Sequence, residues 1–165
     1  MMDPKTFVDR YGGVFEHSAF IAERAYPKMA RETAFNASNV HVALCHAFRE
    51  ASREERLGVL RAHPDLAGRL AIVGKLTEQS RQEQAGAGLD HLTRDEHDRF
   101  SELNRQYKDR FGFPFIIAVK GLGKDDILRA FEKRIKNTEP DEFVAACDEV
   151  EKIALHRLRA IHPEN

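Results

Sequence analysis

The sequence has little of what several common protein classes require. It contains two cysteines, Cys45 and Cys147, which lie far apart and form neither a CxxC motif nor a disulfide framework. We expect both to be reduced thiols, buried as small hydrophobic groups. No apolar run approaches the roughly 20 residues of a membrane-spanning helix. The chain shows no apolar secretory signal and no SKL-type peroxisomal address, which predicts a cytoplasmic protein with no membrane contact.

An excess of one charge is also missing. Lys and Arg number 26, Asp and Glu number 27, and the formal net charge is -1. Proteins that bind nucleic acids or membrane surfaces usually carry a basic excess, so neither partner is expected. The 165 residues, 42% of them hydrophobic, suffice for a core, and no linker, repeat or low-complexity segment divides them. We therefore predict a single domain over residues 1–165.

Helix signals dominate the sequence. Apolar residues recur at helical spacing within 38–51, where Ser38 is the expected N-cap. Capping boxes, Ser52 with Glu55 and Thr93 with Glu96, predict the starts of two further helices. The same periodicity continues through 124–137 and 140–161, the latter opened by Thr138. The pattern predicts an all-α helical bundle.

Two stretches depart from the helical pattern: the loop-like join around RAHPDLAG (61–68), where Pro64 disfavours helix at the preceding residue, and an apolar run later in the chain. Residues 111–123, FGFPFIIAVKGLG, form the most apolar run and are interrupted by glycine and proline. The composition is β-like and the run is too short for a buried helix, so we predict a short extended segment near 113–119. An isolated extended segment leaves backbone N–H and C=O groups in need of partners. This makes it a candidate wall of a binding site.

The eight histidines do not indicate a metal site. None has the spacing of an HExxH motif, and no cysteine pair supplements them. His63 differs in setting because it directly precedes Pro64, at the predicted end of a helix. It could move a proton near neutral pH, or it could stabilise the end of that helix by charge. Asp65 has an alternative role as N-cap of the segment LAGRLAI.

Residues 77–88, TEQSRQEQAGAG, place Ser80, Glu83 and Gln84 at helical spacing. One helix face could therefore present a hydroxyl, a carboxylate and a carboxamide together. The alternative is an ordinary solvated helix. The small residues that follow, AGAG, would allow another element to approach closely.

Several of these motifs together resemble one enzyme family. YGGVFEHSAFIAERA (11–25), HPDLAGRLA (63–71), LTEQSRQEQAGAGLDHL (76–92), LNRQYKDRFGFPFIIAVKG (103–121) and the closing helix are similar to 2-oxo-4-hydroxy-4-carboxy-5-ureidoimidazoline (OHCU) decarboxylases. The resemblance covers nearly the whole chain. It implies an all-helical, usually homodimeric enzyme without cofactor or metal. Its reaction would be the decarboxylation of OHCU to (S)-allantoin in urate (purine) degradation.

The resemblance also implies roles for particular residues. His63 matches the catalytic histidine, and Glu83 matches the carboxylate placed against the urea-like edge of the substrate. Arg157 matches a basic residue of the closing helix, although Arg159 competes for this position. The remaining substrate-binding positions are Pro64, Ser80, Arg81, Gln82, Gln84, Phe115, Ile116, Ile117, Ala118 and Val119.

Two alternatives remain open from the sequence. One is another lyase or hydrolase that acts on a ureido or hydantoin compound. The other is a non-catalytic helical interaction module, which would need an exposed apolar groove at FPFIIAV and would make His63 a helix cap.

Overall fold

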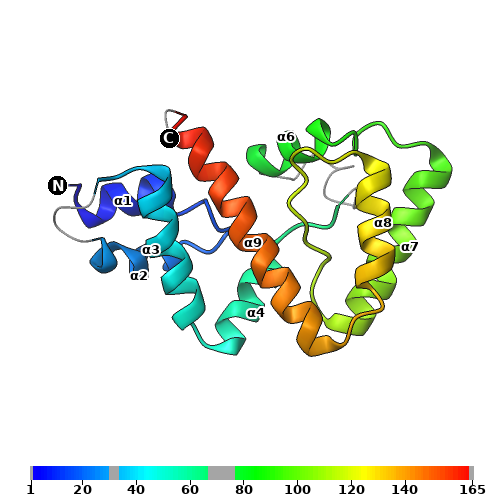
Figure 1. Cartoon of the computed structure of the whole chain (residues 1–165), viewed down its shortest axis with the longest axis horizontal. Coiled ribbons are helices and arrows are strands. Elements are labelled where there is room, and N and C mark those ends of the chain that lie inside the picture. Colours follow the sequence, from blue (N-terminus) through cyan, green and yellow to red (C-terminus); the bar gives the residue numbers. More distant parts are fainter. Residues whose placement is uncertain (1, 30–33, 67–76, 164–165) are drawn as a thin grey trace. The chain divides into compact units, whose positions relative to one another are not determined.

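A computed structural model of the chain describes residues 2–29, 34–66 and 77–163, and every regular element among them is a helix (Figure 1). The predicted all-α class is confirmed. The chain divides into two compact units, Met1–Ala62 with Val150–Asn165, and His63–Glu149. The long helix α9 (Glu139–Ile161) contributes its first half to the second unit and its second half to the first. A single domain over 1–165 remains a prediction.

The first unit is built on short helices with aromatic contacts between them. Helix α1 begins where Asp3 accepts a hydrogen bond from the Thr6 N–H at 2.9 Å. Phe15 and Phe48 pack with their ring centroids 5.2 Å apart and are fully buried. Both cysteines of the chain are free and buried, as expected. The described elements of the first unit are α1 (Pro4–Tyr11), α2 (Phe20–Ala25), the 3-10 turn Tyr26–Lys28, α3 (Ala37–Glu50), α4 (Arg53–Ala62) and the end of α9.

The start of α3 differs from the prediction. Asn36, not Ser38, is the N-cap: its side chain accepts the Asn39 N–H at 2.9 Å. Ser38 lies inside the first turn, where its backbone is already helical. The start of α4 is as predicted, because Ser52 and Glu55 exchange backbone-to-side-chain hydrogen bonds of 3.0 and 3.1 Å.

The second unit holds most of the predicted site. Its described helices are α6 (Glu78–Gly86), α7 (Arg94–Phe111), α8 (Lys124–Arg134) and the first half of α9. The predicted capping box of Thr93 and Glu96 is present at the start of α7. Thr138 caps α9 by accepting the Asp141 N–H at 3.3 Å. Here, too, the sequence signals locate the helix starts.

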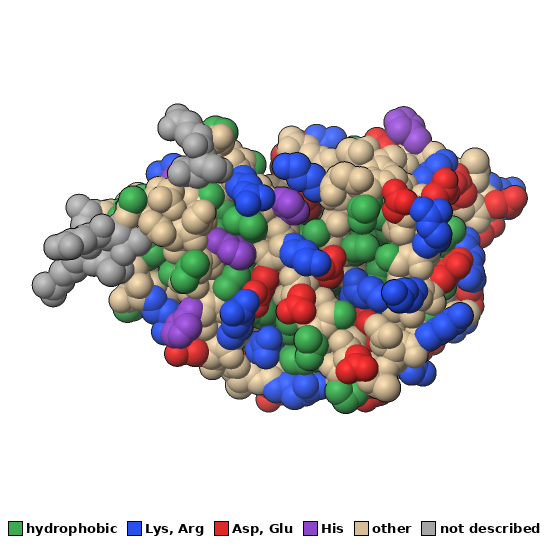
Figure 2. Space-filling model, in the orientation of Figure 1, with side chains coloured by type: hydrophobic (Ala, Val, Ile, Leu, Met, Phe, Trp, Pro, Cys, Tyr) green, Lys and Arg blue, Asp and Glu red, His purple; other side chains and the backbone are tan. Residues whose placement is uncertain are grey.

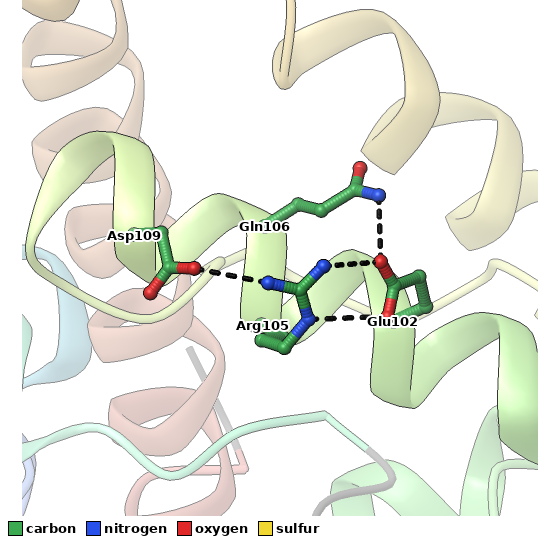
Figure 3. A network of polar contacts seen from close by, with 4 residues as sticks. All are labelled: Glu102, Arg105, Gln106 and Asp109. Carbon is green, nitrogen blue, oxygen red and sulfur yellow. Dashed lines mark hydrogen bonds and ion pairs between the residues drawn. The ribbon is translucent and has the colours of Figure 1, made fainter.

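The exposed face of α7 carries a network of charged and amide side chains (Figure 3). Arg105 donates to Glu102 at 2.5 and 3.2 Å and to Asp109 at 3.2 Å, and Gln106 donates to Glu102 at 2.8 Å. These pairs lie three or four residues apart, the spacing at which side chains of one helix meet. The hydrogen bonds from Arg105 lower the pKa of Glu102 to about 2.

The extended segment follows α7 directly. Gly112 ends the helix with a φ of 79°, a left-handed conformation that glycine adopts without strain. No helix is formed over 113–119, and the side chains of Phe113, Phe115 and Ile116 are buried. The Phe115 ring stacks on Phe131 of α8 with a centroid distance of 4.0 Å. The predicted extended apolar segment is confirmed, and it packs into the core of its unit.

The surface carries charges of both signs. Figure 2 shows Lys and Arg side chains mixed with Asp and Glu on the visible face, in keeping with the net charge of -1. Within the described ranges, no helix has the length and apolar character needed to cross a membrane.

Candidate active site

His63 lies at the first residue after α4, in the second unit. Its side chain is 7% exposed, and Pro64 beside it is half-buried. A proline disfavours helical backbone at the preceding residue, which explains why α4 ends at Ala62. The bend predicted from the sequence is therefore present and presents a largely buried imidazole.

Side chains from two helices hold the residues after this bend. Asn104 of α7 donates to the Leu66 carbonyl at 2.9 Å, and Lys108 pairs with the Asp65 carboxylate at 2.9 Å. Gln84 of α6 donates to the Asp65 carbonyl at 3.4 Å. These contacts fix the chain immediately after His63. The alternative role of Asp65, as N-cap of LAGRLAI, concerns residues that lie mostly outside the described part of the chain.

Helix α6 separates its polar residues into two faces. Thr77 caps the helix by accepting the Ser80 N–H at 3.2 Å. Ser80 and Gln84, one turn apart, are 4% and 6% exposed, and Glu83 is half-buried. One face of this helix is therefore buried and not solvated, and a binding role for Ser80, Glu83 and Gln84 stays a prediction.

Arg81 and Gln82 lie on the exposed side of α6. Both donate to the Glu78 carboxylate, Arg81 at 2.6 and 3.1 Å and Gln82 at 2.8 Å. The Glu78 carboxylate has a lowered pKa because of these hydrogen bonds. A direct role of Arg81 or Gln82 in substrate binding stays a prediction.

The segment Phe115–Val119 uses two of its backbone groups to bind side chains. The Ile116 carbonyl accepts a hydrogen bond from Arg134 of α8 at 2.5 Å. The Ala118 N–H donates to Glu149 of α9 at 3.1 Å. Neither Arg134 nor Glu149 was predicted as part of the site.

A buried polar network is connected to this segment through Arg134. Glu142 of α9 is 0% exposed and accepts hydrogen bonds from the Tyr107 hydroxyl at 2.5 Å, from Arg134 at 2.8 Å and from Asn137 at 3.0 Å. Burial, together with the neighbouring carboxylate, raises the pKa of Tyr107. The Arg134 guanidinium also stacks over the Phe115 ring at 4.5 Å. The network joins α7, α8, α9 and the extended segment.

Arg157 belongs to the first unit. Its guanidinium forms an ion pair with Glu16 at 2.8 Å and donates to the Val14 carbonyl at 3.3 Å. The arginine is 5% exposed, whereas Arg159 is exposed on the same helix. Of the two arginines considered for the site, Arg157 is thus the one held in a fixed, buried position. Its contact with substrate stays a prediction.

The described residues offer no evident place for a metal ion. Across the three described ranges, no group of three or more His, Cys, Asp or Glu side chains lies close enough to hold one. The second unit carries an imidazole at His63, a hydroxyl at Ser80, a carboxylate at Glu83 and a carboxamide at Gln84. Such groups can bind and orient a small polar molecule and transfer a proton.

Comparison with known proteins identifies the family. Residues 1–159 match the family model described as OHCU decarboxylase. The chain is 43% identical over 157 residues to the 2-oxo-4-hydroxy-4-carboxy-5-ureidoimidazoline decarboxylase of Haloferax volcanii, covering 95% of this chain and 89% of that protein. It is 36% identical over 157 residues to the protein of the same name from Mus musculus, covering 95% of this chain and 86% of that one.

Solved structures agree with this result. A crystal structure of (S)-allantoin synthase superposes with a TM-score of 0.76 at 30% identity, covering 98% of this chain and 51% of that chain. A structure of OHCU decarboxylase in the presence of (S)-allantoin shares the fold with a TM-score of 0.68 at 21% identity, covering 88% of this chain and 92% of that chain. The family match spans nearly the whole sequence. The chain belongs to the OHCU decarboxylase family.

Proposed function

We propose that this protein is a carboxy-lyase that decarboxylates OHCU to (S)-allantoin in urate degradation. The observation that carries the proposal is the match of residues 1–159 to the family model. The largely buried His63 bend, held by side chains of α6 and α7, supports it. OHCU is the small-molecule partner, and a cytoplasmic homodimer is the expected form of the enzyme.

The chemistry of the substrate defines what the protein must do. Loss of carbon dioxide leaves an electron pair on the ring carbon that carries the hydroxyl group. The neighbouring C=N bond can take up this pair, so the electrons have an acceptor within the substrate itself. The nitrogen of that bond gains a proton, which gives an enol. The enol then gains a proton at the carbon bearing the ureido group and loses the hydroxyl proton, which gives the carbonyl of allantoin. The protein must orient the carboxylate, stabilise the spreading charge and deliver that proton to one face.

The residues of the second unit suit these tasks. We assign His63 to the hydroxyl group of the substrate, where it polarises the O–H bond and takes part in proton transfer. We assign Glu83 to the ureido N–H groups, whose hydrogen bonds would fix the rotation of the ring. Pro64 and Phe115–Val119 would form the apolar wall. General acid–base help of this kind is typically worth about 10²–10⁴ in rate.

The structure bears on one of the alternatives. An interaction module would need an exposed apolar groove at FPFIIAV, but Phe113, Phe115 and Ile116 are between 1% and 4% exposed. The apolar residues therefore form core and not an open docking surface. The other alternative, a lyase or hydrolase that acts on a different ureido or hydantoin compound, differs from the proposed enzyme in its substrate, and an assay with several substrates distinguishes the two.

The test uses the optical activity of the product. OHCU decomposes spontaneously to racemic allantoin, so freshly prepared OHCU is followed by circular dichroism with and without the protein. We expect (S)-allantoin to appear faster than in the blank. Activity on 5-hydroxyisourate or allantoin without activity on OHCU would overturn the proposal. The variant Glu83→Gln should lower kcat/KM, and an unchanged value would remove Glu83 from the site.

A further inference from the structure

The extended segment 113–119 is held by side chains and not by a neighbouring strand. All regular elements within the described ranges are helices, so no strand pairs with its backbone there. Two of its groups instead bind charged side chains of α8 and α9: the Ile116 carbonyl binds Arg134, and the Ala118 N–H binds Glu149. Hydrogen bonds with a charged partner are stronger than neutral ones. The two contacts therefore fix this stretch of backbone at alternate residues.

The two contacts determine which way the backbone N–H and C=O groups of Ile117 face. In extended backbone, the N–H and C=O groups of successive residues face opposite sides. The Ile116 carbonyl faces Arg134 and the Ala118 N–H faces Glu149. The N–H and C=O of Ile117 therefore face away from both side chains. Within residues 2–29, 34–66 and 77–163, neither of these two Ile117 groups forms a backbone hydrogen bond. Ile117 itself is 9% exposed.

One of the two anchors is itself fixed in place. Arg134 donates from Nε to the fully buried Glu142 at 2.8 Å and forms an ion pair with it, with Nη2 at 2.6 Å from the carboxylate. Its guanidinium also stacks on Phe115. A buried carboxylate needs such a cation, because its desolvation is otherwise costly. The orientation of Arg134 is thus set by the core and not by the segment that it holds.

We propose that Arg134 and Glu149 are positioning residues for substrate binding: by holding Ile116 and Ala118, they turn the N–H and C=O of Ile117 toward the amide groups of the substrate ring. The inference rests on the proposed function and adds to it two residues that do not contact substrate. A ring amide offers one donor and one acceptor side by side, which a single residue's N–H and C=O can match. A fixed backbone pair of this kind loses little freedom on binding.

Glu149 is the better residue for the test. Its side chain is only half-buried, so its removal should leave the fold intact, whereas removal of Arg134 would leave buried Glu142 without its cation. Glu149→Ala removes the acceptor for the Ala118 N–H, and Glu149→Gln retains one. The matched control is Asp148→Ala, which removes the neighbouring, exposed carboxylate of the same helix.

Two readouts separate positioning from a structural role. Amide hydrogen exchange of Ala118, measured by NMR, should be faster in Glu149→Ala and close to wild type in Glu149→Gln and Asp148→Ala. The KM for OHCU should rise about tenfold in Glu149→Ala, the scale of one hydrogen bond to a charged group. The value of kcat should change less, and the KM of Glu149→Gln should lie close to the wild-type value.

The outcomes distinguish this inference from the proposed function. Wild-type protein that does not act on OHCU would overturn both. Active wild-type protein combined with an unchanged KM in Glu149→Ala would overturn the positioning role alone. An equal rise of KM in Glu149→Ala and Asp148→Ala would also overturn it, because a general loss of negative charge would then explain the effect.

Discussion

The hydroxyl of Tyr107 gives the most direct test of the buried network around Glu142. Tyr107→Phe keeps the buried ring and removes only the donor that lies 2.5 Å from the Glu142 carboxylate. Hydrogen bonds to charged groups contribute about 1.5–3 kcal/mol. Arg134 and Asn137 still bind Glu142, so the carboxylate remains paired and the loss should not exceed this range. For a chain of this length, it corresponds to a fall in Tm of roughly 3–12 °C.

The assay is urea unfolding followed by far-ultraviolet circular dichroism, with Tyr26→Phe as the matched control. Tyr26 donates to a neutral acceptor, the Met2 carbonyl, at 2.6 Å in a partly buried position. A neutral hydrogen bond contributes about 0.5–1.5 kcal/mol, so Tyr26→Phe should cost less. If Tyr107→Phe costs no more than Tyr26→Phe, the Glu142 network does not have the energetic role argued for it.

Three further predictions follow from single contacts. The pKa of Glu102 is lowered to about 2 by Arg105, so the contribution of Glu102 to stability is complete above its ordinary pKa near 4.5 and is lost as the pH falls toward 2. Glu102→Gln should therefore flatten the fall in Tm over that pH range. An unaltered profile would contradict the pairing. Burial raises the pKa of Cys45 to about 12, so iodoacetamide at pH 8 should label Cys45 rapidly only after unfolding, and rapid labelling of the folded protein would refute its burial. Asn104→Ala removes the donor to the Leu66 carbonyl and should lower kcat for OHCU more than Lys108→Ala does, because the ion pair that Lys108 forms with Asp65 is partly exposed. Equal effects would argue against Asn104 as the main support of the His63 bend.

Local signals in the sequence located most helix starts correctly. The capping boxes at Ser52 and Thr93 are both formed, because each depends only on residues three positions apart. The prediction of Ser38 as a cap was wrong because the helix begins earlier: Asn36 is the N-cap and accepts the Asn39 N–H. Helix α1 was not located, although Asp3 followed by Pro4 is a typical helix start.

The support of the site was harder to predict than its central residues. His63 stands out because it precedes proline, and the family resemblance points to the same residue. The anchors Arg134 and Glu149 reach the extended segment from positions 18 and 31 residues away, and no local pattern marks such contacts. Asn104 did carry a signal, since it interrupts the apolar stripe of α7 between Leu103 and Tyr107. A polar residue on an apolar face indicates a buried hydrogen bond, here to Leu66.

The central claim is that His63 is the catalytic group of an OHCU decarboxylase. The most direct measurement is the rate of (S)-allantoin formation from fresh OHCU by wild type and His63→Asn, followed by circular dichroism, with unfolding curves recorded for both. We predict a loss of about 10²–10⁴ in kcat for a variant that remains folded. A folded His63→Asn protein that forms (S)-allantoin at nearly the wild-type rate would contradict the claim.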